Sequence, residues 1–357
     1  MSISLAEASK LSTDILLKGI IETIVKDSPI LQDLPFIQIV GNSLKYNREK
    51  TLPTVGWYAP VTGTWTTSEL AFEQCSATLC VLGGDADVDN FLKSTRSNIQ
   101  DLEAAVIELK AKALRNEFEN TFLNGDSGVD ANQPDGLYKT MRGTAWQASH
   151  AYVLGDVVVP TSGLENGFRY ECTTAGTSGA SEPTWKTTEG ETNTDGTATW
   201  TCRLGNHVGS GANGATLSLT SMDKLIDLVR GGKPDILLMS RRSRRKITTL
   251  ARAAGTNLQV GQGKLGEFVE LYNGIPVAIS DWVIDNYVVG SSTDCSAIFA
   301  FQMGEGAVCG LTSPEVIQVE RLGSLETKDA SRTRVKWYVS LADFSIVKAA
   351  MLTGVRD

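Results

Sequence analysis

Histidine and cysteine are scarce in this sequence. Only two histidines, His150 and His207, occur among the 357 residues. Histidine is the most frequent general base and metal ligand at neutral pH, so its scarcity argues against a histidine-based active site or metal centre. The six cysteines are scattered, without the spacing of a zinc site or the density of a disulfide scaffold. We expect no metal and no cofactor, and we expect the thiols of Cys172 and Cys202 to stay reduced in the cytosol.

The sequence also lacks a long hydrophobic run and an excess of positive charge. No early apolar run approaches the roughly 20 residues that a bilayer span needs, and the acidic, interrupted start is unlike a signal peptide. The net charge is −8, with 41% hydrophobic and 21% charged residues. This balance is typical of an ordered protein whose main role is not to hold nucleic acid. We expect a cytosolic protein of two or more modules, with no membrane partner.

Catalytic motifs are missing as well. GxSxG, HExxH and GxxxxGK[ST] do not occur, and the two GxGxxG matches, at 209–214 and 261–266, lack the strand before and the helix after that a dinucleotide site requires. A run of acidic residues starting at Asp85 imitates a calcium loop, but Asn90 and Arg96 occupy positions that need Gly and Glu. We expect a solvated turn at that run, and we expect no enzyme.

Regular patterns predict a mixed α+β fold. Apolar residues at helical spacing, including Val106, Leu109, Phe118 and Phe122, predict a long helix over 97–124 that Gly125 ends. Its length would be roughly 40 Å. Short helices are expected over 4–26. Thr, Gly, Pro and aromatic residues mark residues 43–82 and indicate an extended hairpin. It has few core residues, so it must pack against another part of the structure to be stable.

The second half of the chain alternates helices with strands. Ser221 is expected to cap a helix over 222–230, a buried strand follows at 234–240, and a helix is expected over 241–255. Strand-like runs cover 266–280 and 296–302. The tail from 313 to 354 alternates apolar and polar residues through two long strands, which should add to a sheet.

A dense basic cluster marks the start of the helix over 241–255. It comprises Arg241, Arg242, Arg244, Arg245 and Lys246. Clustered positive charge suits phosphate groups, so contact with nucleic acid is one interpretation. No aromatic residues interleave with the cluster, and a solvated face or pairing with carboxylates of a neighbouring subunit is the favoured one.

The order of these parts resembles the major capsid proteins of tailed bacteriophages, a fold shared with herpesvirus capsid proteins. The resemblance is carried by an N-terminal arm, an extended hairpin, the long helix with its "NGDSGVDANQPDGLYK" turn, and then "KPDILLMSRRSRRKITTLAR", "YNGIPVAISDWVI" and the tail. It covers residues 1–143 and 205–357. No single motif is diagnostic, whereas the order of segments is distinctive.

The resemblance implies a division of the chain and a set of partners. The expected parts are an N-terminal arm at 1–48, an extended loop at 49–83, a peripheral domain with a long spine helix at 84–143 and 310–357, an insertion at 144–204, and an axial domain at 205–309. The chain would assemble in the host cytoplasm into hexamers and pentamers of an icosahedral shell around double-stranded DNA, contacted non-specifically. A portal protein and decoration proteins are further expected partners. No long charged helical segment precedes the arm, so a scaffolding protein would be separate or absent, and Lys50 lies where some members crosslink.

The insertion differs in composition from the chain around it. Seventeen of the thirty residues from 173 to 202 are Thr, Ser or Gly. Its frame is similar to the small carbohydrate-binding modules of chitinases, with aromatic residues at Trp146, Tyr152, Tyr170, Trp185 and Trp200. Such rings can stack on sugars, for example host-surface glycans, or form the core of a small all-β module. The core interpretation is favoured for most of them, because a module of this size has little else to bury.

Two hypotheses of different class follow from these observations. In the first, the chain is a major capsid protein with a surface insertion that binds a glycan or a decoration protein, or fills a gap between capsomers. In the second, it is a glycan-active enzyme or another virion protein that carries a carbohydrate-binding module. Catalytic proteins usually append such modules at a terminus through a linker, whereas this one is nested, which favours the capsid hypothesis.

Overall fold

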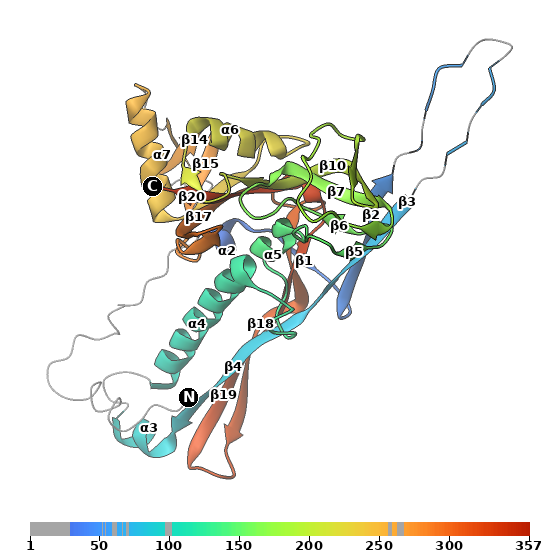
Figure 1. Ribbon diagram of the computed structural model, residues 1–357. Coiled ribbons are helices and arrows are strands. Elements are labelled where there is room, and N and C mark those ends of the chain that lie inside the picture. The colour runs from blue at the N-terminus through green and yellow to red at the C-terminus, as the bar shows by residue number, and fades with distance from the viewer. Residues whose placement is uncertain are drawn as a thin grey trace.

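The computed structural model describes residues 29–51, 53, 55–58, 63–65, 67–68, 71–96, 102–255, 259–262 and 268–357. The short helices predicted over 4–26 lie outside the described residues, as does the side chain of Lys50. Figure 1 shows a body built on one large sheet, a long helix lying beside a β ribbon below it, and a hairpin that projects from the opposite side. The mixed α+β class predicted from the sequence is confirmed.

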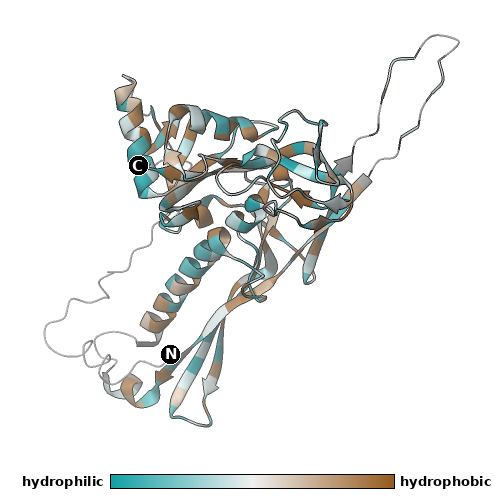
Figure 2. Cartoon of the chain, viewed as in Figure 1, coloured by the Kyte–Doolittle hydropathy of each residue, from teal (hydrophilic) through white to brown (hydrophobic). Residues whose placement is uncertain are grey.

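The large sheet has twelve strands. Along its main path these are β13 (Gln259–Gln262), β14 (Phe268–Tyr272), β15 (Ile275–Ile279), β12 (Ile236–Met239), β17 (Ser292–Phe301), β20 (Ala349–Arg356), β10 (Ala198–Gly209), β7 (Asn166–Thr174) and β6 (Val157–Val158). Beside this path, β11 (Ala215–Thr216) pairs with β20, β16 (Tyr287–Val289) with β17, and β9 (Thr192–Asp195) with β10. Its central strands are hydrophobic (Figure 2), as expected of strands that are covered on both faces.

Two helices, α6 (Leu219–Leu228) and α7 (Arg241–Ala253), pack on this sheet. The cap predicted at Ser221 is wrong. The N-cap of α6 is Ser218, whose hydroxyl accepts a hydrogen bond from the Ser221 backbone N–H at 3.1 Å. In return, the Ser221 hydroxyl accepts a hydrogen bond from the Ser218 backbone N–H, also at 3.1 Å. A serine three residues inside a helix can complete a capping box, which moves the start of the helix toward the N-terminus.

A second sheet forms the ribbon in the order β1 (Phe36–Gln38), β18 (Val308–Ser324), β19 (Ala330–Asp343) and β4 (Cys80–Asp89). The two long tail strands are therefore confirmed. The solvated turn expected at Asp85 is wrong, because that run belongs to β4. Asp85 and Asp87 lie directly opposite Arg334 and Arg332 on β19 and form ion pairs with them at 2.6 Å. Alternating carboxylates stay in a strand when the facing strand supplies guanidinium groups.

Helix α4 (Leu102–Asn124) lies along this ribbon, after the short helix α3 (Asn90–Arg96). The predicted end at Asn124 is confirmed, and Phe118 and Phe122 are buried as expected, whereas Leu109 is 47% exposed. A side chain on Gly125 would collide with the carbonyl oxygens of Pro134 and Thr121. Glycine is needed there because the loop that leads to α5 (Leu137–Arg142) returns at Pro134 and packs its backbone directly against the end of α4.

The predicted extended hairpin consists of β2 (Ser43–Thr51) and β3 (Ala71–Thr78), which pair antiparallel in a sheet of two strands. The remaining elements are the short helix α2 (Ile30–Asp33), the pair β5 (Ala151–Tyr152) and β8 (Gly176–Thr177), and the 3-10 turn η1 (Ile346–Lys348).

The insertion is continuous with the large sheet. Strand β10 crosses the boundary expected at 204, and its last residues, from His207 to Gly209, pair with β20. Strand β20 itself, expected in the peripheral domain, pairs with β17 in the large sheet. The insertion thus has its own aromatic core but shares backbone hydrogen bonds with the body.

Candidate functional site

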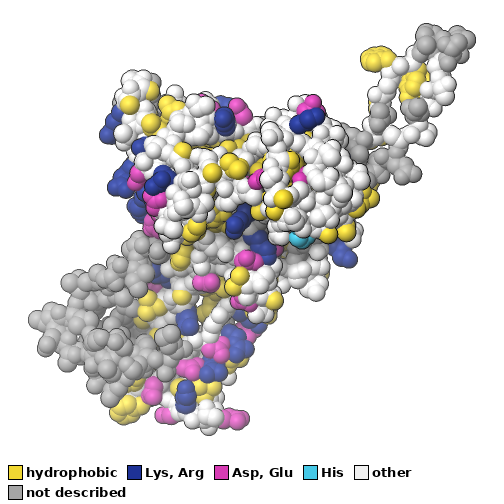
Figure 3. Space-filling view, viewed as in Figure 1, with side chains coloured by type: hydrophobic (Ala, Val, Ile, Leu, Met, Phe, Trp, Pro, Cys, Tyr) yellow, Lys and Arg dark blue, Asp and Glu magenta, His cyan; other side chains and the backbone are white. Residues whose placement is uncertain are grey.

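The hairpin exposes large aromatic side chains. Trp57 is fully exposed, Trp65 is 79% exposed and Phe72 is 63% exposed. Tyr58 and Trp65 pack against each other with ring centroids 4.5 Å apart. Figure 3 shows hydrophobic side chains on the projecting hairpin, well clear of the body. Exposed apolar groups of this size are typical of surfaces that contact another protein.

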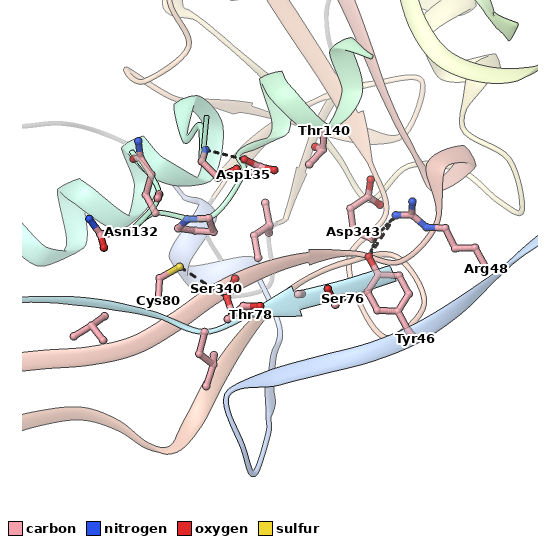
Figure 4. Close-up of a pocket in the computed structure, with 18 of the residues that line it drawn as sticks. Tyr46, Arg48, Ser76, Thr78, Cys80, Asn132, Asp135, Thr140, Ser340 and Asp343 are labelled. Carbon is pink, nitrogen blue, oxygen red and sulfur yellow. Dashed lines mark hydrogen bonds between the residues drawn. The ribbon is translucent and has the colours of Figure 1, made fainter. Parts of the chain in front are cut away.

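Two side chains of β2 fix the base of the hairpin to the end of β19 (Figure 4). The Tyr46 hydroxyl donates a hydrogen bond to the Asp343 carbonyl at 2.9 Å, and Figure 4 shows Tyr46 and Arg48 beside Asp343. Arg48 Nε donates to the Phe344 carbonyl at 3.0 Å. Arg48 Nη2 also donates to the Asp343 carbonyl. The ring of Tyr46 packs edge-on against Phe344 with centroids 4.7 Å apart. We call this set the hairpin latch.

The carboxyl group of Asp343 is buried beside the latch. Burial raises its pKa to about 6, although the nearby Arg48 guanidinium acts in the opposite direction. Its Oδ1 atom has no hydrogen-bond partner in the described part of the chain. Sequence reasoning missed the latch, because its members lie at opposite ends of the chain and no local pattern connects them.

The aromatic residues of the insertion form its core. Tyr170 and Trp200 are fully buried, and Trp146 and Tyr152 are each 6% exposed. Asp195 organises this core, since its Oδ2 accepts hydrogen bonds from Trp146 Nε1 at 2.8 Å and Trp200 Nε1 at 3.2 Å. These four rings are covered by protein and offer no free face to a sugar.

Trp185 alone among the five keeps part of its ring accessible. One face stacks on Tyr170 with centroids 4.0 Å apart, and its Nε1 donates to Glu182 Oε1 at 2.7 Å. A single ring that is already stacked on a neighbour is a weak platform for a sugar, since recognition of glycans uses open aromatic faces flanked by polar groups.

The basic cluster on α7 is largely neutralised within the chain. Arg241 pairs with Asp281 at 2.8 Å, Arg242 with Asp285 at 3.5 Å, and Arg244 with Glu270 at 3.2 Å. The side chains of Arg245 and Lys246 form no ion pair within the described residues. Figure 3 shows acidic side chains interspersed among the basic ones in this region. Intramolecular pairing reduces the field that a phosphate backbone would meet.

A buried polar cluster joins the insertion to the large sheet. The Nε2 atom of His207 on β10 lies 2.8 Å from the Thr353 hydroxyl on β20 and 3.8 Å from Glu165 Oε1. Burial lowers the pKa of His207 to about 4 and raises the pKa of Glu165 to about 6. Both groups are therefore neutral in part of the pH range where their exposed counterparts carry charge.

All six cysteines are free thiols. Burial raises the pKa of Cys202 to about 11, so this thiol is protonated and unreactive at neutral pH. Within the described residues, no group of three or more His, Cys, Asp or Glu side chains could hold a metal ion. Among the helices in the described part of the chain, none is long and apolar enough to cross a membrane.

The fold has many solved relatives. An encapsulin from Synechococcus elongatus PCC 7942 is similar with a TM-score of 0.62 at 14% identity, over 99% of this chain and 96% of that one. The capsid of a native GTA particle is similar with a TM-score of 0.58 at 13% identity, over 99% and 98% of the two chains. The capsid of Myoviridae phage XM1 is similar with a TM-score of 0.58 at 12% identity, over 96% and 97%.

At these identities the likeness shows the fold alone, and the family rests on the sequence. No curated protein matches the chain. The model of the phage capsid family matches residues 12–300, which is most of the length of this chain. Together with the long helix, the ribbon and the projecting hairpin described above, this match identifies the chain as a member of the phage capsid family.

Proposed function

We propose that this chain is the major capsid protein of a tailed phage and that its copies assemble into the hexamers and pentamers of an icosahedral head shell. The shell encloses double-stranded DNA, which the inner surface contacts only non-specifically. Membership of the phage capsid family supports a role as a shell protein. The solved relatives include chains described as capsids and an encapsulin, which supports self-association as the role of this fold.

The main observation that supports this proposal is the exposed, projecting hairpin. A two-stranded hairpin is marginally stable at best in water, and ordering each of its residues opposes folding. The described residues of the chain leave Trp57 fully exposed and cover only a small part of Trp65, which is 79% exposed. A second copy that covers these rings offsets the entropy of ordering the hairpin. Obligate interfaces of this kind bury on the order of 2,000 Å² or more, so stability belongs largely to the assembly.

The division of labour follows the expected parts of the chain. In this proposal the extended loop at 49–83, which follows the expected arm at 1–48, lies over a neighbouring copy. The peripheral domain at 84–143 and 310–357 forms the wall of the capsomer, except that β20 joins the large sheet, and the axial domain at 205–309 meets its equivalents at the capsomer centre. A portal protein, a separate scaffolding protein and decoration proteins complete the particle, which assembles in the host cytoplasm.

The insertion at 144–204 serves as a structural module in this proposal. Its aromatic residues are mostly core residues, held by Asp195 and by stacking among themselves. That arrangement supports contact with a neighbouring capsomer or a decoration protein in preference to a host glycan. It likewise favours a non-enzymatic shell protein over a glycan-active enzyme, for which the insertion was the principal argument.

Electron microscopy of the expressed full-length chain tests the proposal. We expect uniform closed shells, because the exposed hairpin can bury its aromatic rings only on other copies. A compact monomer that persists at high concentration in light scattering overturns it. The double variant Trp57→Ala/Trp65→Ala should fold and yet fail to close shells, whereas Val129→Ala, an apolar residue 84% exposed elsewhere, should assemble normally.

A further inference from the structure

Three arginines from distant segments converge on one pocket beside the hairpin latch. Arg48 comes from β2, Arg169 from β7 and Arg203 from β10, and all three line a pocket of about 390 Å³. Phe344 and Val157 supply apolar walls, and three carboxylates, those of Glu49, Glu73 and Glu171, also line the pocket, so its charge is balanced overall and a site for a further anion depends on the unpaired Arg169. The pocket therefore lies where the root of the hairpin, the insertion and the end of β19 come together. We call it the elbow pocket.

Two of these guanidinium groups already have partners. Arg203 pairs with Glu171 at 3.1 Å, and Arg48 donates to the backbone carbonyls of Asp343 and Phe344 in the latch. Neither Arg48 nor Arg203 can accept a hydrogen bond from Arg169, since a guanidinium group has only donors. Arg203 also lies directly opposite Arg169 in the β7–β10 pair, and like charges at such positions repel each other.

Arg169 is the group left over. No hydrogen bond or ion pair joins its guanidinium to another described residue, and its Nε atom is buried without an acceptor. Glu73 and Glu171 attract it through charge alone, and burial lowers its pKa. The side chain nevertheless stays protonated, so the fold holds a half-buried cation with free donors. A partly buried, unpaired cation destabilises the fold unless an anion forms an ion pair with it.

We propose that the elbow pocket receives a carboxylate side chain from a second copy of this chain, which pairs with Arg169. A carboxylate matches the planar fork of a guanidinium with two parallel hydrogen bonds. The chain offers such groups in surplus, with 41 Asp and Glu against 33 Lys and Arg. The pocket also adjoins the hairpin, whose exposed aromatic rings contact another copy under the proposed function, on which this inference rests.

The pairing has a consequence for the insertion. Because Arg169 and Arg203 belong to β7 and β10 while Arg48 belongs to the hairpin, a carboxylate in the pocket bridges the insertion to the root of the hairpin. The insertion then belongs to the contacts of the lattice and helps to set the direction in which the hairpin leaves the body. Val153 and Leu154, which are 64% and 72% exposed, come directly before the pocket residue Gly155 in the chain.

Substitution of Arg169 tests the proposal in the full-length chain. Arg169→Met keeps the length of the side chain and removes the charge, so the concentration needed for shell formation should rise at least about tenfold. Arg169→Lys should give an intermediate value, because it keeps the charge and loses the fork. The matched control is Arg252→Met, on an exposed arginine of α7 outside the basic cluster and without an ion pair in the described residues, and it should assemble like the wild type. Thermal unfolding of the unassembled variants verifies that the fold is retained.

A cryo-EM map of wild-type shells supplies the second readout. We expect a carboxylate of a neighbouring copy within about 4 Å of the Arg169 guanidinium, the usual limit for an ion pair. A pocket that holds only solvent or a small ion, or an Arg169→Met chain that assembles like the wild type, overturns the inference while the proposed function stands. If the wild-type chain forms no shells at all, the proposed function fails first, and the two failures are thereby distinguished.

Discussion

Two β regions of this chain, the insertion and the hairpin, are both rich in Thr and both contain tryptophans, but they differ in whether those tryptophans are buried. The insertion carries three tryptophans where the hairpin carries two. In the insertion Trp200 is fully buried, whereas in the hairpin Trp57 is fully exposed and Trp65 is 79% exposed. Composition alone therefore does not decide whether a tryptophan in a polar, strand-prone segment forms a core or an interface.

The number of strands explains the difference. In the insertion, β10 pairs with β7, β9 and β20, and the loops fold back so that Trp185 and Tyr152 pack against Trp200. The described residues of the hairpin form only β2 and β3, and two strands cannot enclose a side chain between layers. A module that lacks a third layer in its own chain can obtain one only from another molecule.

Trp200→Ala should have the largest effect on folding. Removing a fully buried aromatic ring leaves a cavity and deprives Asp195 of a donor, so we expect a loss of about 3–5 kcal/mol in the free energy of unfolding. Urea unfolding of the full-length chain, followed by circular dichroism, measures it. A loss below about 1 kcal/mol would contradict the view that the insertion folds around this residue.

Acid should weaken the insertion through His207, by up to about 3 kcal/mol. Burial lowers the folded-state pKa of His207 to about 4 from 6.5, so the unfolded chain binds the extra proton, and stability present above pH 6.5 is lost as the pH falls toward 4. Glu165 acts in the opposite direction. Its folded-state pKa of about 6 lies above 4.5, so its contribution is present below pH 4.5 and is lost as the pH rises through 6.

The effect of His207 is therefore isolated by comparing the wild type with His207→Gln. Glutamine is neutral at every pH, so the variant should lose less stability than the wild type between pH 6.5 and 4. Urea unfolding at several pH values in this window measures both chains. Parallel curves would show that burial of His207 does not contribute to acid sensitivity.

Arg48→Met should have a smaller effect that is confined to the hairpin. The variant loses the hydrogen bonds that Arg48 donates to the Asp343 and Phe344 carbonyls, which we expect to weaken local stability by about 1–2 kcal/mol. Amide hydrogen exchange should accelerate in β2 and β3 and stay unchanged in β7 and β10. Equal acceleration in both regions would mean that the hairpin and the insertion do not open separately.

Trp65→Ala should have the smallest effect on folding. Its side chain is 79% exposed, so the free energy of unfolding of the unassembled chain should change by less than about 0.5 kcal/mol. The same urea experiment measures it, with Trp200→Ala as the matched buried tryptophan. A loss comparable to that of Trp200→Ala would remove the contrast between the two regions.

Sequence reasoning was most successful where the signal is local. The end of α4 at Asn124, the buried strand β12 and the long strands β18 and β19 follow from periodicity and from glycine placement. It failed where a distant strand decides. The acidic run at Asp85 resembles a turn until Arg334 and Arg332 are placed opposite it on β19, and the insertion resembles a separate module until β10 pairs with β20.

The candidate functional surfaces also separate into those with a local sequence signal and those formed by distant segments. The aromatic residues of the insertion and the basic cluster on α7 are visible in the sequence, but their burial and their ion pairs are not. The hairpin latch and the elbow pocket were not predicted at all. Their members come from three remote segments, and no spacing in the sequence relates Arg48 to Arg169 or to Asp343.

By itself, the amino-acid sequence determined the local elements of this protein, because caps, periodicity and turns act over a few residues. It also determined, through the order of those elements, the resemblance to phage capsid proteins. Only the tertiary structure decided which tryptophans are enclosed and which are left for another copy. Burial depends on how many strands and loops surround a side chain, and those neighbours come from parts of the chain that no local pattern connects.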